Sequence, residues 1–166
     1  ESHPHGLDLG ELQPGRFPER LFTPDKTIRC LPDAIPAELA RFAADMADTP
    51  NDALLLIGRR HLRSNNSWLH NSHRLLKGPD RCTLMIHPAD AAARGITDGQ
   101  PVTITSRVGE VTAPAEVTDA VMPGTVSLPH GWGHGREGVQ LSVARQRPGV
   151  SINDLTDRQR FDPLSG

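Results

Sequence analysis

Turn-forming residues limit the length of every structural element in this chain. Of its 166 residues, 15 are glycine and 15 are proline. Glycine readily adopts positive φ, and proline cannot donate a backbone hydrogen bond, so both residues interrupt helices and strands. The sequence therefore predicts short strands joined by turns, with few long helices.

The composition is that of one globular domain with an additional arm. Hydrophobic residues make up 36% and charged residues 23%, and no apolar run approaches the roughly 20 residues of a membrane-spanning helix. We find no signal-peptide pattern, and we interpret Cys30 and Cys82 as reduced thiols, which predicts a cytoplasmic location. Because the chain does not begin with Met, we expect it to be an excised fragment of a longer protein.

Residues 1–52 differ in pattern from the rest of the chain. Proline and glycine break residues 1–33 repeatedly, which predicts an irregular arm that packs on a globular body. Residues 36–47 begin with Pro36 and place apolar side chains at helical spacing. We therefore expect an arm followed by one short amphipathic helix.

Residues 53–166 carry the strand patterns. The apolar runs 53–57 and 82–86 are typical of strands buried on both faces, and the first run ends at Gly58. Further strands are predicted at 102–106 and 111–117, which the turn 107–110 links as a hairpin, and at 125–128. A short helix is predicted at 88–94, and one more strand or turn at 150–155. Short strands separated by small helices and turns favour a compact β-barrel.

Positive charge is concentrated in one short segment. Residues 59–81 contain six lysines and arginines against Asp80 alone, whereas residues 1–58 contain five against ten acidic residues. Such a segment attracts phosphate, nucleic acid or acidic lipid. A solvated basic surface loop would give the same pattern, so charge alone leaves both interpretations open.

The junction after the first apolar run combines groups that bind nucleotides. Gly58 allows a turn or a close approach to a ligand, and Arg59 or Arg60 can hold a phosphate with a planar fork of donors. Side chains that can bond to phosphate, ribose or a heterocycle follow: His61, Ser64, Asn65 and Asn66. The spacing matches neither common glycine-rich nucleotide motif, so the junction alone is weak evidence.

A second unusual stretch is rich in glycine and histidine and contains His130, Gly131, Trp132 and Gly133. It is suited to a loop that fits closely around a flat ligand, but Trp132 could equally fill the core. No further ligand follows at a usual zinc spacing, so we predict no metal site. We also find no serine or cysteine nucleophile motif and predict no catalytic residue in this chain.

Three stretches, residues 87–102, 117–126 and 129–133, resemble the C-terminal molybdopterin dinucleotide-binding domain of the dimethyl sulfoxide reductase superfamily. This superfamily includes formate dehydrogenases and assimilatory nitrate reductases. The resemblance covers residues 53–163 and implies a mainly β fold with short helices. Specifically, it implies a six-stranded double-psi β-barrel over residues 53–166, preceded by the arm and helix of residues 1–52.

The resemblance also implies a function. Such a domain caps the bis-(molybdopterin guanine dinucleotide) of a molybdenum or tungsten oxidoreductase. The metal, its protein ligand and any iron–sulfur cluster belong to upstream domains of the same polypeptide. The isolated chain is therefore expected to bind cofactor without being active.

The resemblance assigns site residues as well. It places Gly58 and Arg59 at a strand-end turn, and it leaves open which arginine meets phosphate. The other residues that it assigns to cofactor binding are Arg60, His61, Ser64, Asn65, Asn66, His130, Gly131, Trp132, Gly133, Asn153 and Asp162, with Asn71 extending the polar surface.

Two other functions fit the same sequence. A basic β-barrel could bind nucleic acid, but four phenylalanines and no tyrosine provide few stacking platforms for bases. A structural interaction domain without a ligand is the third hypothesis.

Overall fold

A computed structural model describes residues 2–47 and 52–160, which belong to two separate units of the chain. In the first unit, residues 2–33 contain turns and bends, and α1 follows at Ala34–Ala47. The predicted irregular segment and helix are therefore confirmed. The predicted packing of the arm on the body stays a prediction. No helix in the described parts of the chain has the length and apolar character needed to cross a membrane.

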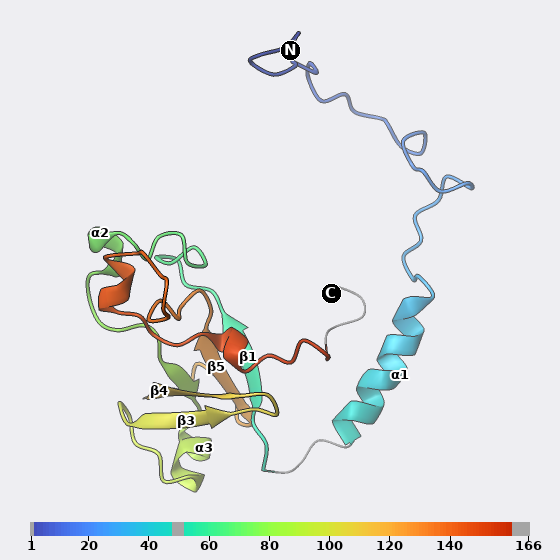
Figure 1. Cartoon of the computed structure of the whole chain (residues 1–166). Helices are drawn as coiled ribbons and strands as arrows, with labels where there is room; N and C mark the ends of the chain where they lie inside the picture. The colour runs from blue at the N-terminus through green and yellow to red at the C-terminus, as the bar shows by residue number, and fades with distance from the viewer. Residues whose placement is uncertain (1, 48–51, 161–166) are drawn as a thin grey trace. The chain divides into compact units, whose positions relative to one another are not determined.

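The second unit is mainly β with short helices, as predicted (Figure 1). Its strands are β1 Leu55–Arg59, β2 Leu84–Ile86, β3 Pro101–Thr105, β4 Glu110–Val117 and β5 Thr125–Pro129. Its helices are α2 His73–Leu76 and α3 Pro88–Ala93, with 3₁₀ turns η1 Ala144–Gln146 and η2 Ile152–Asp154. The stretch 150–155 is thus a turn.

The five strands form a mixed sheet in the order β1-β5-β2-β4-β3. β5 pairs in parallel with β1 and antiparallel with β2, and every residue of β5 is buried. β2 runs parallel to β4, and β4 forms the predicted antiparallel hairpin with β3. Within residues 52–160, β1 and β3 are the two edges of this sheet. A sixth strand that closes a barrel therefore stays a prediction.

The prediction that the first apolar run is buried on both faces was wrong. β1 lies at an edge of the sheet, where Leu55 is 65% exposed and Ile57 is 43% exposed. The strand also continues through Gly58 to Arg59, which pairs with Pro129. A run of apolar residues does not reveal whether a strand is central or at an edge, because this depends on its neighbours in the sheet.

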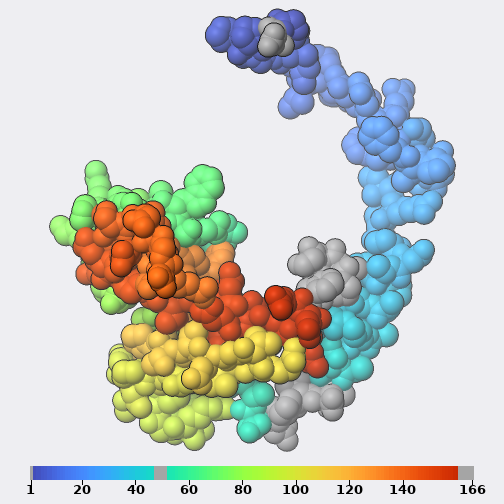
Figure 2. All heavy atoms as spheres, viewed as in Figure 1, coloured from blue at the N-terminus to red at the C-terminus, as the bar shows by residue number. Residues whose placement is uncertain are grey.

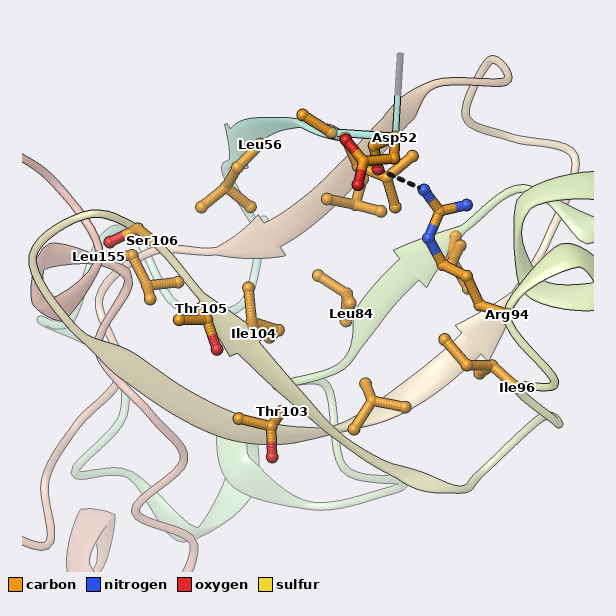
Figure 3. A pocket seen from close by; sticks show the side chains of 15 residues that line it. Asp52, Leu56, Leu84, Arg94, Ile96, Thr103, Ile104, Thr105, Ser106 and Leu155 are labelled. Atoms are coloured by element: carbon orange, nitrogen blue, oxygen red, sulfur yellow. Dashed lines mark hydrogen bonds between the residues drawn. The ribbon is translucent and has the colours of Figure 1, made fainter. Parts of the chain in front are cut away.

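The main core lies against the sheet and combines residues from β2, β4 and β5 with Ile152 and Leu155 of the C-terminal segment. An apolar hollow of about 430 Å³ remains between the two edge strands (Figure 3). Leu56 of β1 and Ile104 of β3 line it from opposite sides, and Arg94 donates a 2.7 Å hydrogen bond to the Asp52 carbonyl at its rim. The hollow therefore lies where the two edge strands, β1 and β3, face each other without pairing.

The stretch that begins with His87 and Pro88 has a structural role. Pro88 occupies the first turn of α3, and Nδ1 of His87 accepts a hydrogen bond from the Ala89 amide. Asp90 accepts a 2.8 Å bond from the Gly124 amide, which ties α3 to the turn before β5. These contacts cap the helix and fix the start of β5.

Candidate functional site

Two loops meet at the carboxyl ends of β1 and β5. We call residues 60–72 the strand-end loop and residues 130–135 the glycine-rich loop. The His130 amide donates a 3.2 Å hydrogen bond to the Arg59 carbonyl. Gly131 has a φ of 87°, and a Cβ at this position would lie 1.9 Å from the Asn66 carbonyl oxygen. Only glycine allows this backbone contact, so the two predicted ligand-binding stretches do lie side by side (Figures 1 and 2).

Several polar side chains of the strand-end loop hold the loop itself together. Ser64 is buried, and its hydroxyl donates a 2.9 Å bond to the His61 carbonyl. Asn65 and Asn66 adopt the left-handed conformation, with φ of 41° and 62°. The Oδ1 atom of Asn71 accepts bonds from two amides at the start of η1. Ser64 and Asn71 therefore maintain the loop conformation.

The cationic side chains of this region lie in different environments. The Arg59 guanidinium turns into the sheet and donates to the carbonyls of Thr83 and Ser127. Arg60 is exposed, and its Nη2 donates a 3.1 Å bond to Oδ1 of Asn66. The pKa of His61 is lowered by partial burial and by the charges of nearby arginines. The lowered pKa favours the neutral imidazole, in which Nδ1 accepts a bond from the Arg63 amide and Nε2 is left as a donor.

Trp132 is only 7% exposed and packs in a small second core with Leu76, Cys82 and Val143. Of the two interpretations of the stretch, the one in which Trp132 fills the core is confirmed. The neighbouring Gly133 amide donates a 2.8 Å bond to the Pro148 carbonyl, which anchors the glycine-rich loop. Trp132 thus anchors the glycine-rich loop to the second core, and its buried ring does not offer an open stacking surface.

A buried pair of histidines joins the two loops and was not anticipated from the sequence. Nδ1 of His70 lies 2.7 Å from Nε2 of His134, and the His70 ring lies 4.1 Å from the Trp132 ring, centroid to centroid. Burial, followed by the neighbouring His134, lowers the pKa of His70 to about 4. Because 64 residues separate the two histidines, no local sequence pattern reveals the pair.

Three buried ring nitrogens at this contact have no hydrogen-bond partner among the described residues: His70 Nε2, His130 Nε2 and Trp132 Nε1. Buried polar groups in folded proteins are usually paired. The junction of the two loops therefore retains unused hydrogen-bonding capacity.

The third predicted element is the C-terminal turn η2. Asn153 is exposed and lines a hollow of about 520 Å³ together with Arg107 and Arg158. A Cβ on Gly133 would lie 2.8 Å from the Cβ of Ser151, which shows that η2 packs beside the glycine-rich loop. Asp162 lies outside the described residues.

The predicted residues do not all share one hollow. Arg59 and His61 line a separate hollow of about 470 Å³ with Arg81 and Glu116. No three His, Cys, Asp or Glu side chains gather into a metal-binding group within residues 2–47 and 52–160. The site is therefore an extended surface built from three segments.

Sequence reasoning missed two exposed side chains of the strand-end loop. Trp68 is 81% exposed, and Arg63 is also exposed. The guanidinium of Arg63 has no hydrogen-bond or ion-pair partner among the described residues, since only its backbone amide is bonded, to Nδ1 of His61. The sequence signal that could have identified them is a tryptophan within a cation-rich loop, because nucleotide-binding surfaces often combine an aromatic ring for stacking with positive charge for phosphate.

Comparison with known proteins identifies relatives of this region. Residues 54–166 match the family model described as "Molydopterin dinucleotide binding domain". Trimethylamine-N-oxide reductase of Haemophilus influenzae is 56% identical over 52 residues, which cover 31% of this chain and 6% of that protein. The molybdopterin-containing subunit of the arsenate respiratory reductase of Chrysiogenes arsenatis is 31% identical over 118 residues. This match covers 66% of this chain and 14% of that subunit.

Among solved structures, acetylene hydratase from Pelobacter acetylenicus matches with a TM-score of 0.52 and 21% identity. The match covers 76% of this chain and 16% of that one, and at this identity it shows a similarity of fold alone. The chain spans less than a fifth of the length of these relatives.

Proposed function

Because this chain belongs to the family of molybdopterin dinucleotide-binding domains, we propose that it binds the guanine dinucleotide form of molybdopterin. The observation that carries the proposal is the backbone contact between Gly131 and Asn66. This contact brings the cationic strand-end loop and the glycine-rich loop together at the carboxyl ends of β1 and β5. Ligands of open sheets with parallel strands bind at such an edge, beyond the carboxyl ends of the strands.

The residues present fit the chemistry of this cofactor. Its pyrophosphate needs cations and N–H donors, which the exposed Arg60 and Arg63 provide. Its heterocycles present donor and acceptor edges, which suit the side-chain amides of Asn65 and Asn153. The buried Nε2 of His130, which has no partner among the described residues, adds hydrogen-bonding capacity in the glycine-rich loop. The remaining residues assigned by resemblance have supporting roles in this proposal. The strand-end loop is shaped by Gly58, Arg59, His61, Ser64 and Asn66. The glycine-rich loop is supported by Trp132 and Gly133, and the last residue assigned to cofactor binding is Asp162.

When bound, the cofactor supplies a redox-active molybdenum or tungsten. This chain would hold the dinucleotide in place, exclude water from one side of it, and set the electrostatic environment through its arginines and the neutral His61. It contributes no catalytic residue in this proposal.

The proposed parent protein is a cytoplasmic molybdopterin oxidoreductase whose upstream domains hold the metal. The relatives support this proposal because they are far longer than the matched region. In that setting residues 53–166 would form the closed six-stranded double-psi barrel, with the arm of residues 1–52 packed on it. The nucleic-acid alternative finds no support in the comparisons.

The test is a nuclear magnetic resonance titration of the isotopically labelled 166-residue chain with guanosine diphosphate, a stable part of the cofactor. We expect shifts of the amide signals of residues 58–67 and 130–134. Adenosine diphosphate is the matched control and should bind more weakly if the guanine ring is recognised. Shifts confined to other regions, such as the β3–β4 hairpin, would contradict the proposed site.

A further inference from the structure

The side chain of Arg59 forms a polar network inside the sheet. Only 18% of this side chain is exposed. Its Nη2 donates 2.8 Å bonds to both the carbonyl and the hydroxyl oxygen of Thr83, and its Nη1 donates to the Ser127 carbonyl. The guanidinium therefore ties the end of β1 to β5 and to the segment that leads into β2.

An acidic partner completes this network. Nη2 of Arg59 lies 4.0 Å from Oε2 of Glu116 on β4, and the Thr83 hydroxyl donates to the same carboxylate oxygen. Burial lowers the pKa of Arg59, and the charge of Glu116 opposes this effect. The charge of Arg59 is thus already compensated within the protein, and most of its donors are already bonded.

The next two arginines along the chain differ from Arg59. Arg60 is exposed, and within residues 2–47 and 52–160 its side chain donates one hydrogen bond, to the neutral amide of Asn66. Arg63 is exposed, and its guanidinium has no partner among the described residues. Neither side chain forms an ion pair with an acidic residue in the described part of the chain. Their full charge is therefore available to an anion.

We propose that Arg59 is a positioning residue that fixes the direction in which the strand-end loop leaves the sheet, and that Arg63 and Arg60 bind the phosphates. This inference rests on the proposed function and refines it. The network through Thr83, Ser127 and Glu116 joins β1, β4, β5 and the segment that leads into β2 at the base of the loop. Arg59 would therefore influence phosphate binding through the conformation of the loop and not by direct contact.

The test measures binding of inorganic pyrophosphate to the 166-residue chain by calorimetry at several salt concentrations, together with the melting temperature. Arg63→Ala and Arg60→Ala should each weaken binding about tenfold, make its salt dependence shallower, and leave the melting temperature unchanged. Arg74→Ala is the matched control, because Arg74 is an exposed arginine of the same cation-rich segment but lies on α2. It should leave both quantities unchanged.

Arg59→Gln removes both the charge and the forked hydrogen bonds of Arg59, so it tests whether this charge reaches the phosphates. It should lower the melting temperature by several degrees and weaken binding, while the salt dependence keeps its wild-type slope. A shallower slope with an unchanged melting temperature would show that Arg59 touches phosphate and would overturn the inference alone. Wild-type affinity in both Arg63→Ala and Arg60→Ala would overturn it too. If the wild-type chain binds neither pyrophosphate nor guanosine diphosphate, the proposed function itself is contradicted, and the inference with it.

Discussion

At the scale of single residues, the histidine pair couples the site to pH. His70 is buried against His134 and Trp132, and its pKa in the folded chain is about 4. An exposed histidine in the unfolded chain has a pKa near 6.5, so the unfolded state binds more protons between these two values. The free energy of unfolding therefore contains a contribution that is complete above pH 6.5 and is lost as the pH falls toward 4.

This linkage predicts that acidification from pH 6.5 to 4 lowers the free energy of unfolding by about 3 kcal/mol through His70 alone. Carboxylates add to the acid sensitivity of any protein, so the measurement compares urea denaturation of the wild type with His70→Gln. The variant should lose less stability over this range. His73→Gln changes an exposed histidine of α2 and should behave as the wild type. Equal pH dependence in all three proteins would contradict the assignment.

At the scale of elements, the site depends on how closely two loops approach each other. A Cβ at residue 131 would lie 1.9 Å from a backbone oxygen, and that oxygen cannot rotate away as a side chain could. Gly124 also has a positive φ, of 80°, but an added Cβ there would meet nothing within 4 Å. An alanine at Gly124 therefore measures the free-energy cost of the backbone conformation alone, whereas an alanine at Gly131 adds the cost of the steric clash with Asn66.

We predict that Gly124→Ala destabilises the chain by about 1 kcal/mol and Gly131→Ala by about 3 kcal/mol or more. For a chain of this size the difference corresponds to a gap of roughly 5 °C in melting temperature. Gly131→Ala should also weaken binding of guanosine diphosphate, because the loops must separate, whereas Gly124→Ala should not. Equal melting temperatures for the two variants would show that the loops do not touch in solution.

The elements differ in how far the sequence predicts them. Regular local patterns succeeded: α1, α3 and the β3–β4 hairpin were all expected near their observed positions. The exposure of Leu55 and the roles of Arg59 and Trp132 were not predictable, because they depend on which segments pack against these residues. The Gly131 contact shows the same limit, since its partner Asn66 is distant in sequence.

At the scale of the whole molecule, both hydrophobic cores lie in the second unit. The larger core contains residues of the sheet together with Ile152 and Leu155, and the smaller core contains Leu76, Cys82, Trp132 and Val143. Neither core includes a residue of the first 47 positions. The cooperative folding unit should therefore be complete without the arm and α1.

We predict that a chain truncated to residues 48–166 folds with a β-rich circular dichroism spectrum and unfolds in one cooperative transition. The proposed packing of the arm on the barrel would add stability, so the truncated chain should melt a few degrees below the full chain. Identical melting temperatures would contradict that packing, and loss of the cooperative transition would contradict the independence of the second unit. Guanosine diphosphate binding should persist after truncation, because every residue of the proposed site lies beyond position 57.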